Sequence, residues 1–255
     1  MMHSKLKYIG IIPARYASTR FPGKPLAMIA GKTMIERVYE QALKSLDHVC
    51  IATDDQRIGR TVEQFGGKVV YTSVHHKSGT DRCAEAIHII ESEENTSYDA
   101  VINIQGDEPF IQPSQIQKLM NCLADPDAQI ATLVKPFKNK DELFDPNKVK
   151  VVADINMHGI YFSRAVIPFL RNVVKQDEWV SNHRFFLHIG IYGYRKHVLT
   201  QITKLPPSDL EIAESLEQLR WIENGYKIKL DFTEYDSMGI DTPEDLDRII
   251  SLGMI

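Results

Sequence analysis

Short apolar segments alternate with amphipathic segments along the first half of the chain, and this alternation limits the possible folds more than any other feature. Apolar runs typical of buried strands lie at residues 8–12, 48–53, 68–72 and 100–104. Between these runs, apolar residues recur at helical spacing. Strands and helices in this order form βαβ units with right-handed crossovers. The sequence therefore predicts an α/β fold with a mostly parallel, twisted sheet and helices on both faces.

The pattern changes from about residue 129. A further strand is predicted at 130–134, and a pair of strands at 149–152 and 159–162 would extend an edge of the sheet. The stretch 171–184 is rich in charged residues, and we expect it to be mobile.

The last part of the chain returns to alternating elements. A strand is predicted at 187–194, followed by a short helix and by one long helix from about Ser208 to Trp221. A late strand at 228–232 and a terminal helix after Pro243 complete the chain. Because 255 residues suit one α/β domain, we expect a single domain with a β-rich excursion.

Composition and charge exclude several classes of protein. The 30 basic and 34 acidic residues leave neither half strongly basic, which argues against a general nucleic-acid binder. No apolar run approaches the roughly 20 residues of a membrane span, and the apolar stretch near the N-terminus is too short for a signal peptide. The three cysteines lie far apart and suit neither a disulfide framework nor a zinc site. We expect a soluble, cytoplasmic protein that binds neither nucleic acid nor membranes.

The segment Tyr8–Leu26 joins the first predicted strand to a basic loop. The strand stops at Pro13, and the loop then carries three cations, two hydroxyls and a glycine, namely Arg15, Ser18, Thr19, Arg20, Gly23 and Lys24. Ligands of open α/β sheets bind beyond the carboxyl ends of the strands, so this loop suits a polyphosphate. The alternative is a solvated loop that happens to be basic.

Other familiar ligand motifs do not fit. Gly31-Lys32-Thr33 resembles the end of a P-loop, but Leu26 stands where the first glycine would be. The segment 190–193 has two glycines without the GxGxxG spacing of dinucleotide-binding folds. The adjacent pair His75 and His76 is more typical of a surface loop than of a metal site.

Two aspartates each follow an apolar segment and lie in a turn beside a proline. Asp107 lies in QGDEP and Asp241 in GIDTP, and a parallel sheet would bring both to the edge that carries Arg15 and Lys24. Each bare carboxylate facing a triphosphate at ~4 Å would cost about 4 kcal/mol at an effective dielectric of ~20. A Mg²⁺ ion between them reverses the sign of this interaction. The sequence predicts a magnesium site at Asp107 and Asp241, with a turn or N-cap role as the alternative for each.

A second polar set lies in the later half of the chain. It consists of Arg164, of His188 and Tyr192 on one face of a strand, and of Glu214, Glu217 and Gln218 at i, i+3 and i+4 of the long helix. These residues could hold a polyhydroxylated acid, with arginine on the carboxylate and the others on hydroxyls. The alternative is a helix face of solvated glutamates.

With these residues in view, the chain resembles the 3-deoxy-manno-octulosonate cytidylyltransferases, the CMP-Kdo synthetases of Gram-negative lipopolysaccharide synthesis. The matching segments are IIPARYASTRFPGKPL, IAGKTMIERV, ATDD, SGTDR, NIQGDEP, DPNKVKVV, YFSRAVIP, HIGIYGYR, SDLEIAESLEQLR and GIDTPEDLDR. They span residues 11 to about 248. The first is shared with other sugar-nucleotide cytidylyltransferases, whereas YFSRAVIP, HIGIYGYR and LEQLR are more particular.

The resemblance implies a nucleotide-diphospho-sugar transferase fold, a homodimer and a reaction. CMP would pass from CTP to the anomeric hydroxyl of Kdo (3-deoxy-D-manno-octulosonate), giving CMP-Kdo and pyrophosphate. Within the single domain over 1–255, residues 1–130 and 226–255 would form the nucleotide-binding core. Residues from about 131 to 225 would bind the sugar acid and contribute to the dimer contact.

The resemblance also implies roles for single residues. The catalytic set is Arg15, Lys24, Asp107 and Asp241, with Mg²⁺ held by the two aspartates. The nucleotide would be bound by Pro13, Ala14, Arg15, Lys24, Ser78, Thr80, Arg82 and Gln105. The sugar acid would be bound by Gln105, Arg164, His188, Tyr192 and Glu217.

Two alternatives remain open. The acceptor could be another sugar acid, such as 8-amino-Kdo or sialic acid. The chain could also be a catalytically silent nucleotide-binding regulator, which would not need both Asp107 and Asp241.

Overall fold

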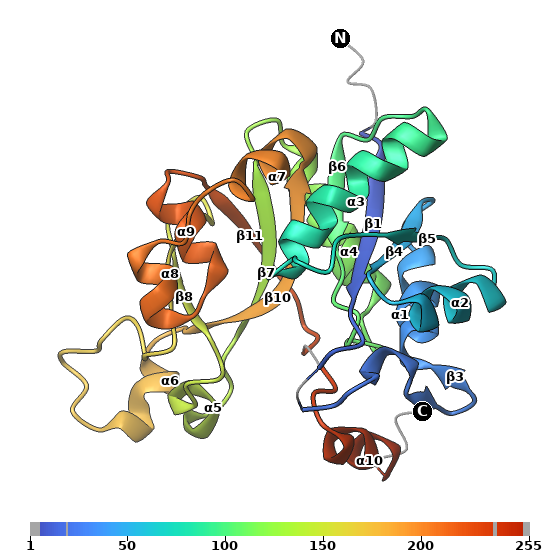
Figure 1. Cartoon of the computed structure of the whole chain (residues 1–255). Coiled ribbons are helices and arrows are strands. Elements are labelled where there is room, and N and C mark those ends of the chain that lie inside the picture. Colours follow the sequence, from blue (N-terminus) through green and yellow to red (C-terminus); the bar gives the residue numbers. More distant parts are fainter. Residues whose placement is uncertain (1–5, 19, 237–238, 252–255) are drawn as a thin grey trace.

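The computed structural model describes residues 6–18, 20–236 and 239–251. Within these residues, nine strands form one sheet, whose main order is β11-β7-β10-β6-β1-β4-β5 (Figure 1). The main-order strands are β1 (Tyr8–Ala14), β4 (Val49–Thr53), β5 (Val69–Tyr71), β6 (Ala100–Asn103), β7 (Ile130–Pro136), β10 (Phe186–Arg195) and β11 (Ile228–Phe232). The remaining two, β8 (Lys150–Ala153) and β9 (Gly159–Ser163), form an antiparallel pair.

Most pairs in the main order are parallel, as predicted. β1 is parallel to both β4 and β6, and β4–β5 and β7–β11 are parallel too. Only β10 runs against its neighbours β6 and β7. Because the carboxyl ends of β1, β4, β5 and β6 share one edge, the loops that follow them meet there.

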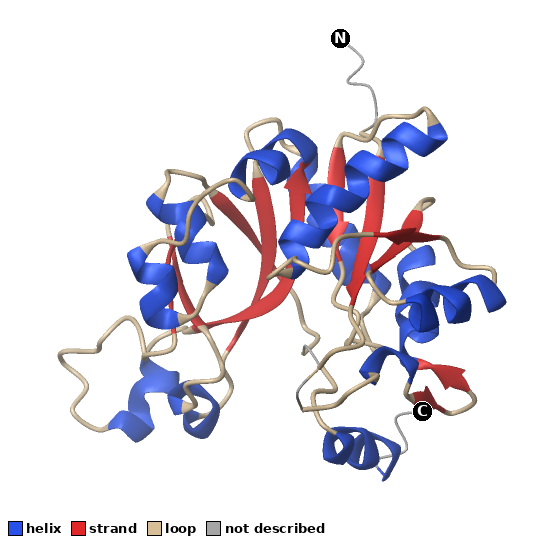
Figure 2. Cartoon of the chain, in the orientation of Figure 1, coloured by secondary structure: helices blue, strands red, loops and turns tan. Residues whose placement is uncertain are grey.

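Helices cover both faces of the sheet (Figure 2). The helices are α1 (Met34–Leu43), α2 (Gln56–Gln64), α3 (Gly79–Glu94), α4 (Pro113–Ala124), α5 (Lys140–Phe144), α6 (Trp179–Asn182), α7 (Lys196–Ile202), α8 (Asp209–Glu214), α9 (Glu217–Glu223) and α10 (Pro243–Ser251), with 3-10 turns η1 (Lys24–Leu26) and η2 (Gln176–Glu178). Helices α1, α2 and α4 pack with Ile12 of β1, whereas α3, α7 and α9 pack in the core that holds Ile9 and Ile11. The central strand is thus buried on both faces, because successive side chains point to opposite sides.

The β-rich excursion joins the sheet differently from the prediction. β8 and β9 do pair with each other, but β8 attaches to Phe186 and Leu187 at the start of β10 and so does not extend an outer strand of the main order. The extra length of β10 makes this possible, since β6 pairs with this strand only further along, at residues 192–195, whereas β7 pairs with it from Phe186 onward.

One expectation for the later half is wrong. The predicted long helix is split into α8 and α9 by Ser215, whose φ of 52° is a left-handed conformation that ends α8. The stretch 171–184 is mostly exposed and contains η2 and α6, and its expected mobility stays a prediction. Its Trp179 is 4% exposed and stacks against Phe185.

The C-terminal segment returns to the side of the molecule that carries the loop after β1. A small hairpin of β2 (Met28–Ile29) and β3 (Lys32–Thr33) precedes α1. Ile240 and Ile249 pack with Ile29 and Met34 in a separate small core. This contact places the start of α10 beside the loop that follows β1. None of the helices in the described part of the chain is long and apolar enough to cross a membrane.

Candidate active site

A cavity of about 280 Å³ lies beyond the carboxyl ends of β1 and β6. Four parts of the chain that are far apart in the sequence contribute to its wall: residues 13–15, 18, 20, 24 and 25 of the first, 76–79 and 82 of the second, 105–107 of the third, and Asp241. The cavity wall includes Pro13, Ala14, Arg15, Lys24, Ser78, Arg82, Gln105, Asp107 and Asp241 among the predicted site residues. The structure therefore brings the predicted catalytic residues and most of the predicted nucleotide-binding residues to one place.

Lys24 connects the two predicted metal-binding aspartates. Its ammonium nitrogen donates to Oδ2 of Asp107 at 2.6 Å and to Oδ1 of Asp241 at 3.0 Å. The other carboxylate oxygen of Asp241 lies 3.1 Å from a guanidinium nitrogen of Arg20. A backbone bond from Ile240 N to Asp107 O, at 3.0 Å, ties together the two turns that carry the aspartates. The carboxylates thus converge on one point that already holds a cation.

This donor set fits a magnesium ion. One oxygen from each aspartate reaches the same ammonium nitrogen, so a single cation position is accessible to both. Within the described residues, no group of three or more His, Cys, Asp or Glu side chains is placed to hold a metal. Mg²⁺ commonly takes one or two carboxylates and completes its shell with substrate phosphates and water. The magnesium site stays a prediction, and its ligands would be Asp107 and Asp241.

The loop after β1 is closed at its base. The carbonyl oxygen of Tyr16 accepts from the backbone N–H groups of Gly23 at 3.0 Å and Ser18 at 2.9 Å. Gly23 has a φ of 72°, which favours glycine, and a Cβ there would lie 3.0 Å from the Tyr16 ring. Arg15 and Arg20 of this loop are exposed at the cavity. Thr19 lies outside the described residues.

The amino end of α3 forms the opposite part of the wall. Ser78 caps this 16-residue helix by accepting from Asp81 N at 3.1 Å, and Ser78 and Gly79 both line the cavity. Free N–H groups and the helix dipole make such an end favourable for anions. Arg82, one turn into the helix, is 4% exposed and also reaches the cavity wall.

Thr80 is placed away from the cavity wall. It is 3% exposed, and its hydroxyl donates to Glu217 Oε2 at 2.7 Å. Glu217 also accepts from Arg220 at 3.0 Å. Burial raises the pKa of Glu217, although the hydroxyls of Thr80 and Ser78 and the charge of Arg220 act in the opposite direction.

His188 and Tyr192, two of the predicted sugar-acid residues, lie side by side outside the cavity wall. The rings of His188 and Tyr192 lie 5.4 Å apart, and Tyr192 pairs with Asn103 of β6 across the sheet. Burial lowers the pKa of His188 to about 3, so its imidazole is neutral near pH 7. Its Nε2 lies 3.0 Å from the Thr132 hydroxyl. Of the predicted set, Gln105 alone is part of the cavity wall.

Arg164 is held by backbone carbonyls. Its guanidinium donates to the carbonyl oxygens of Glu214 at 2.7 Å, Pro146 at 3.1 Å and Ser215 at 3.5 Å. The helix-face arrangement expected for Glu214, Glu217 and Gln218 is wrong, because the break at Ser215 puts Glu214 on α8 and the other two on α9. Glu214 instead accepts from the Ser163 hydroxyl and from Arg164 N.

Some residues at the site were missed by sequence reasoning. His76 and Lys77 line the cavity, although the histidine pair was expected at an ordinary surface loop. His76 pairs with Glu85 of α3, which also accepts from Ser73 N at 2.7 Å. The place of His76 and Lys77 in the sequence could have indicated this position at the cavity. The loop follows β5, and loops after parallel strands lie at the carboxyl edge of the sheet, where ligands bind.

Two polar atoms beside the cavity have no hydrogen-bond partner among the described residues. They are the Tyr192 hydroxyl and Oδ1 of Asn103, on side chains that are 8% and 2% exposed. Buried polar groups of this kind are rare unless a ligand or water completes them. The second predicted polar set therefore has free hydrogen-bonding capacity.

Comparison with known proteins is consistent across sequence and structure. A family model described as cytidylyltransferase matches residues 9–228. A 3-deoxy-manno-octulosonate cytidylyltransferase of Parabacteroides distasonis is 58% identical over 250 residues, which cover 96% of this chain and 98% of the relative. One with the same name from Thermodesulfovibrio yellowstonii is 51% identical over 243 residues, covering 94% and 95%.

Solved structures match over nearly the whole chain. A CMP:2-keto-3-deoxy-manno-octonic acid synthetase complexed with CTP is similar at a TM-score of 0.88 and 41% identity, covering 97% of this chain and 98% of that one. A 4-diphosphocytidyl-2C-methyl-D-erythritol synthase of Anaerococcus prevotii has a TM-score of 0.61 at 14% identity, with 98% and 97% covered, and shows the shared fold alone.

Proposed function

Because the chain belongs to the 3-deoxy-manno-octulosonate cytidylyltransferase family, we propose that it transfers CMP from CTP to the anomeric hydroxyl of Kdo, with release of pyrophosphate. The observation that carries this proposal is the convergence of Lys24, Asp107 and Asp241 at the cavity edge, opposite the amino end of α3. The product, CMP-Kdo, would serve lipopolysaccharide synthesis. A cytoplasmic location belongs to the same proposal and is supported by three free cysteines in the described chain.

The triphosphate would lie between the loop after β1 and the amino end of α3. Arg15 and Lys24 bind its oxygens together with loop amides, and Ser78 and Arg82 hold the nucleoside end. Lys24 then exchanges its aspartate contacts for phosphate oxygens, and its positive charge stabilises the charge that develops as pyrophosphate leaves. When bound by Asp107 and Asp241, Mg²⁺ would supply Lewis-acid polarisation of the phosphates and of the attacking hydroxyl.

Kdo would bind beside this site. Neutral His188, the free Tyr192 hydroxyl and Glu217 take sugar hydroxyls, and Gln105 connects them to the nucleotide cavity. Arg164 has five N–H donors, and those left after its carbonyl contacts are available for the sugar carboxylate. No side chain among the described residues of the cavity wall stands out as a general base, so the proton of the attacking hydroxyl leaves to solvent.

A homodimer belongs to the proposal as well. Large apolar side chains are exposed on the excursion, namely Ile155 at 99%, Val174 at 94%, Phe169 at 73% and Ile160 at 55%. Large apolar side chains that are exposed in a single chain are candidates for a protein–protein interface. A second copy of the chain is the occupant we propose for this surface.

A pyrophosphate-release assay across sugar acids tests the function. The purified chain is given CTP and Mg²⁺ with Kdo, with 8-amino-Kdo, with sialic acid or with no acceptor. We expect release with Kdo well above the no-acceptor level. Greater release with another sugar acid would favour the alternative acceptor, and no release with any of them would favour the silent nucleotide-binding regulator.

A further inference from the structure

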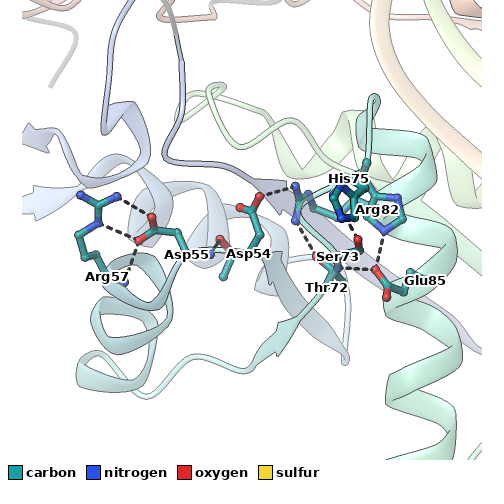
Figure 3. A network of polar contacts seen from close by, with 10 residues as sticks. Asp54, Asp55, Arg57, Thr72, Ser73, His75, Arg82 and Glu85 are labelled. Atoms are coloured by element: carbon teal, nitrogen blue, oxygen red, sulfur yellow. Dashed lines mark hydrogen bonds and ion pairs between the residues drawn. The ribbon is translucent and has the colours of Figure 1, made fainter.

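Two consecutive carboxylates follow β4, and the roles assigned above use neither of them. Asp54 and Asp55 belong to the ATDD segment. Figure 3 shows that they point in different directions, Asp54 toward Arg82 and Asp55 toward Arg57. Their side chains are 19% and 18% exposed, and neither lines the cavity. Asp54 contacts Arg82, which lines the cavity, whereas Asp55 contacts Arg57, which does not.

Asp54 fixes the guanidinium of Arg82. One nitrogen of Arg82 lies 3.3 Å from Asp54 Oδ2, and another donates to the Thr72 hydroxyl at 2.6 Å. The Arg82 side chain is 5% exposed, so it has few other partners to choose from. A buried guanidinium that loses its carboxylate is strongly disfavoured in the same place. Asp54 and Thr72 therefore determine which way Arg82 faces the cavity.

Asp55 acts on the opposite side, through Arg57. Its carboxylate takes two guanidinium bonds from Arg57, at 3.0 and 2.6 Å, and also accepts from Arg57 N at 2.8 Å as the N-cap of α2. The guanidinium carbon of Arg57 lies 3.2 Å from the centre of the Tyr16 ring. A bidentate contact leaves the planar group little freedom, so Asp55 holds the Arg57 guanidinium over this ring.

Tyr16 is the base of the loop after β1. Its carbonyl closes that loop by accepting from Gly23 and Ser18, and its ring lies against Gly23. The residue after Gly23 is Lys24, which carries the ammonium between the aspartates. Contact by contact, Asp55 is thus connected to the group that would meet the triphosphate.

We propose that Asp54 and Asp55 are positioning residues with separate tasks, Asp54 orienting Arg82 toward the nucleoside end of the nucleotide and Asp55 holding the triphosphate loop through Arg57 and Tyr16. The proposal rests on the proposed function in that it assigns the two ends of a bound CTP. It needs no acceptor sugar.

Isothermal titration with two partial ligands separates the tasks. CMP carries the nucleoside end and inorganic tripolyphosphate the phosphate end, and both are titrated at one fixed Mg²⁺ concentration. The matched variants are Asp54→Asn and Asp55→Asn, which keep side-chain shape, and asparagine still caps α2. We expect Asp54→Asn to weaken the binding of CMP about tenfold and to change the affinity for tripolyphosphate by no more than about twofold. Asp55→Asn should weaken the binding of tripolyphosphate about tenfold and leave the affinity for CMP within about twofold.

Second variants guard against a general loss of folding. Thr72→Val removes the other contact of Arg82 and should weaken the binding of CMP. Arg57→Gln removes the exposed cation and should weaken the binding of tripolyphosphate. Combining Asp55→Asn with Arg57→Gln should add little to either single change, because both act through one contact. Melting temperatures are recorded for all variants.

For each variant, the change in affinity for CMP is compared with the change in affinity for tripolyphosphate. Variants that weaken both ligands equally, or that leave both unchanged, would overturn the proposal. If the variants show the expected changes in affinity but the wild-type chain releases no pyrophosphate with Kdo, the proposed function is contradicted and the positioning roles stand.

Discussion

The ammonium nitrogen of Lys24 lies 2.6 Å from Oδ2 of Asp107, although the two residues are 83 positions apart in the sequence. The same nitrogen contacts Asp241 at 3.0 Å. Lysine therefore balances the two carboxylates at the point where a divalent ion and a triphosphate would bind. Binding of both requires Lys24 to change partners while the two aspartates keep their positions.

Replacing Lys24 by Met should weaken CTP binding by about tenfold or more. The variant loses a charge contact with the triphosphate and leaves two carboxylates facing it, and one such contact is worth about 4 kcal/mol at 4 Å and an effective dielectric of 20. The measurement is a CTP titration at fixed Mg²⁺. Lys32→Met is the matched control, because Lys32 pairs with Glu36 and Glu40 on the β2–β3 hairpin side. Equal affinity of Lys24→Met and the wild type would remove Lys24 from the nucleotide site.

Replacing Gly106 by Ala should lower both stability and turnover. A Cβ at Gly106 would lie 2.9 Å from the backbone oxygen of Pro13, so the turn that carries Asp107 must move away from β1. Overpacking of this kind typically costs about 1–3 kcal/mol. Thermal unfolding and pyrophosphate release are the measurements. The stability control is Gly190→Ala, because a Cβ there meets nothing within 4 Å. A Gly106→Ala variant as stable and active as the wild type would show that the turn tolerates the shift.

His188 should make stability depend on pH below neutrality. Burial lowers the pKa of His188 from 6.5 to about 3, so between these values the unfolded chain binds a proton that the folded chain excludes. The free energy of unfolding should therefore fall as the pH drops below about 6.5, by up to about 1.4 kcal/mol per pH unit. Urea unfolding at pH 7, 6 and 5 should give a shallower slope for His188→Gln, with exposed His197→Gln as control. An unchanged slope in His188→Gln would show that His188 does not cause it.

The proposed dimer should depend on the apolar surface of the excursion. The double variant Ile155→Asp/Val174→Asp places charges on two side chains that are 99% and 94% exposed in the single chain. If a second copy covers these side chains, each substitution removes about 1.5–3 kcal/mol of apolar burial from the interface. The dimer dissociation constant of the double variant should then rise about a hundredfold or more. Sedimentation velocity at micromolar concentration is the measurement, with Met28→Asp on the β2–β3 hairpin as control. A double variant that stays dimeric would place the interface elsewhere.

Much of the first half of the fold follows from local pattern. The strands at β1, β4, β5 and β6 and the helices between them were predictable because buried parallel strands are continuous apolar runs and the helices are amphipathic. Parallel strands also share one carboxyl edge. That rule is why Asp107 could be expected near Lys24 before any coordinates were known.

The later half could not be predicted to the same depth, because its shape depends on distant contacts. The break at Ser215 is stabilised when Glu214 accepts from Ser163 and Arg164 of another segment, and no local breaker residue marks it. The residue type of Arg164 suggests an anion ligand, which stays a prediction. Its contacts with backbone carbonyl oxygens could not be predicted from the sequence. Trp179 was a local sign of burial within a charged stretch.

Asp107 and Asp241 are proposed to act together on the reacting phosphates, and turnover of the Asp107→Asn variant is the sharpest test of that role. Asparagine keeps the size of the side chain but removes the charge. We expect kcat for pyrophosphate release at saturating CTP and Kdo to fall by about a thousandfold, which corresponds to about 4 kcal/mol of transition-state stabilisation. The dissociation constant for CTP should change only a few-fold. Turnover close to that of the wild type would show that the Asp107 carboxylate does not act on the phosphates.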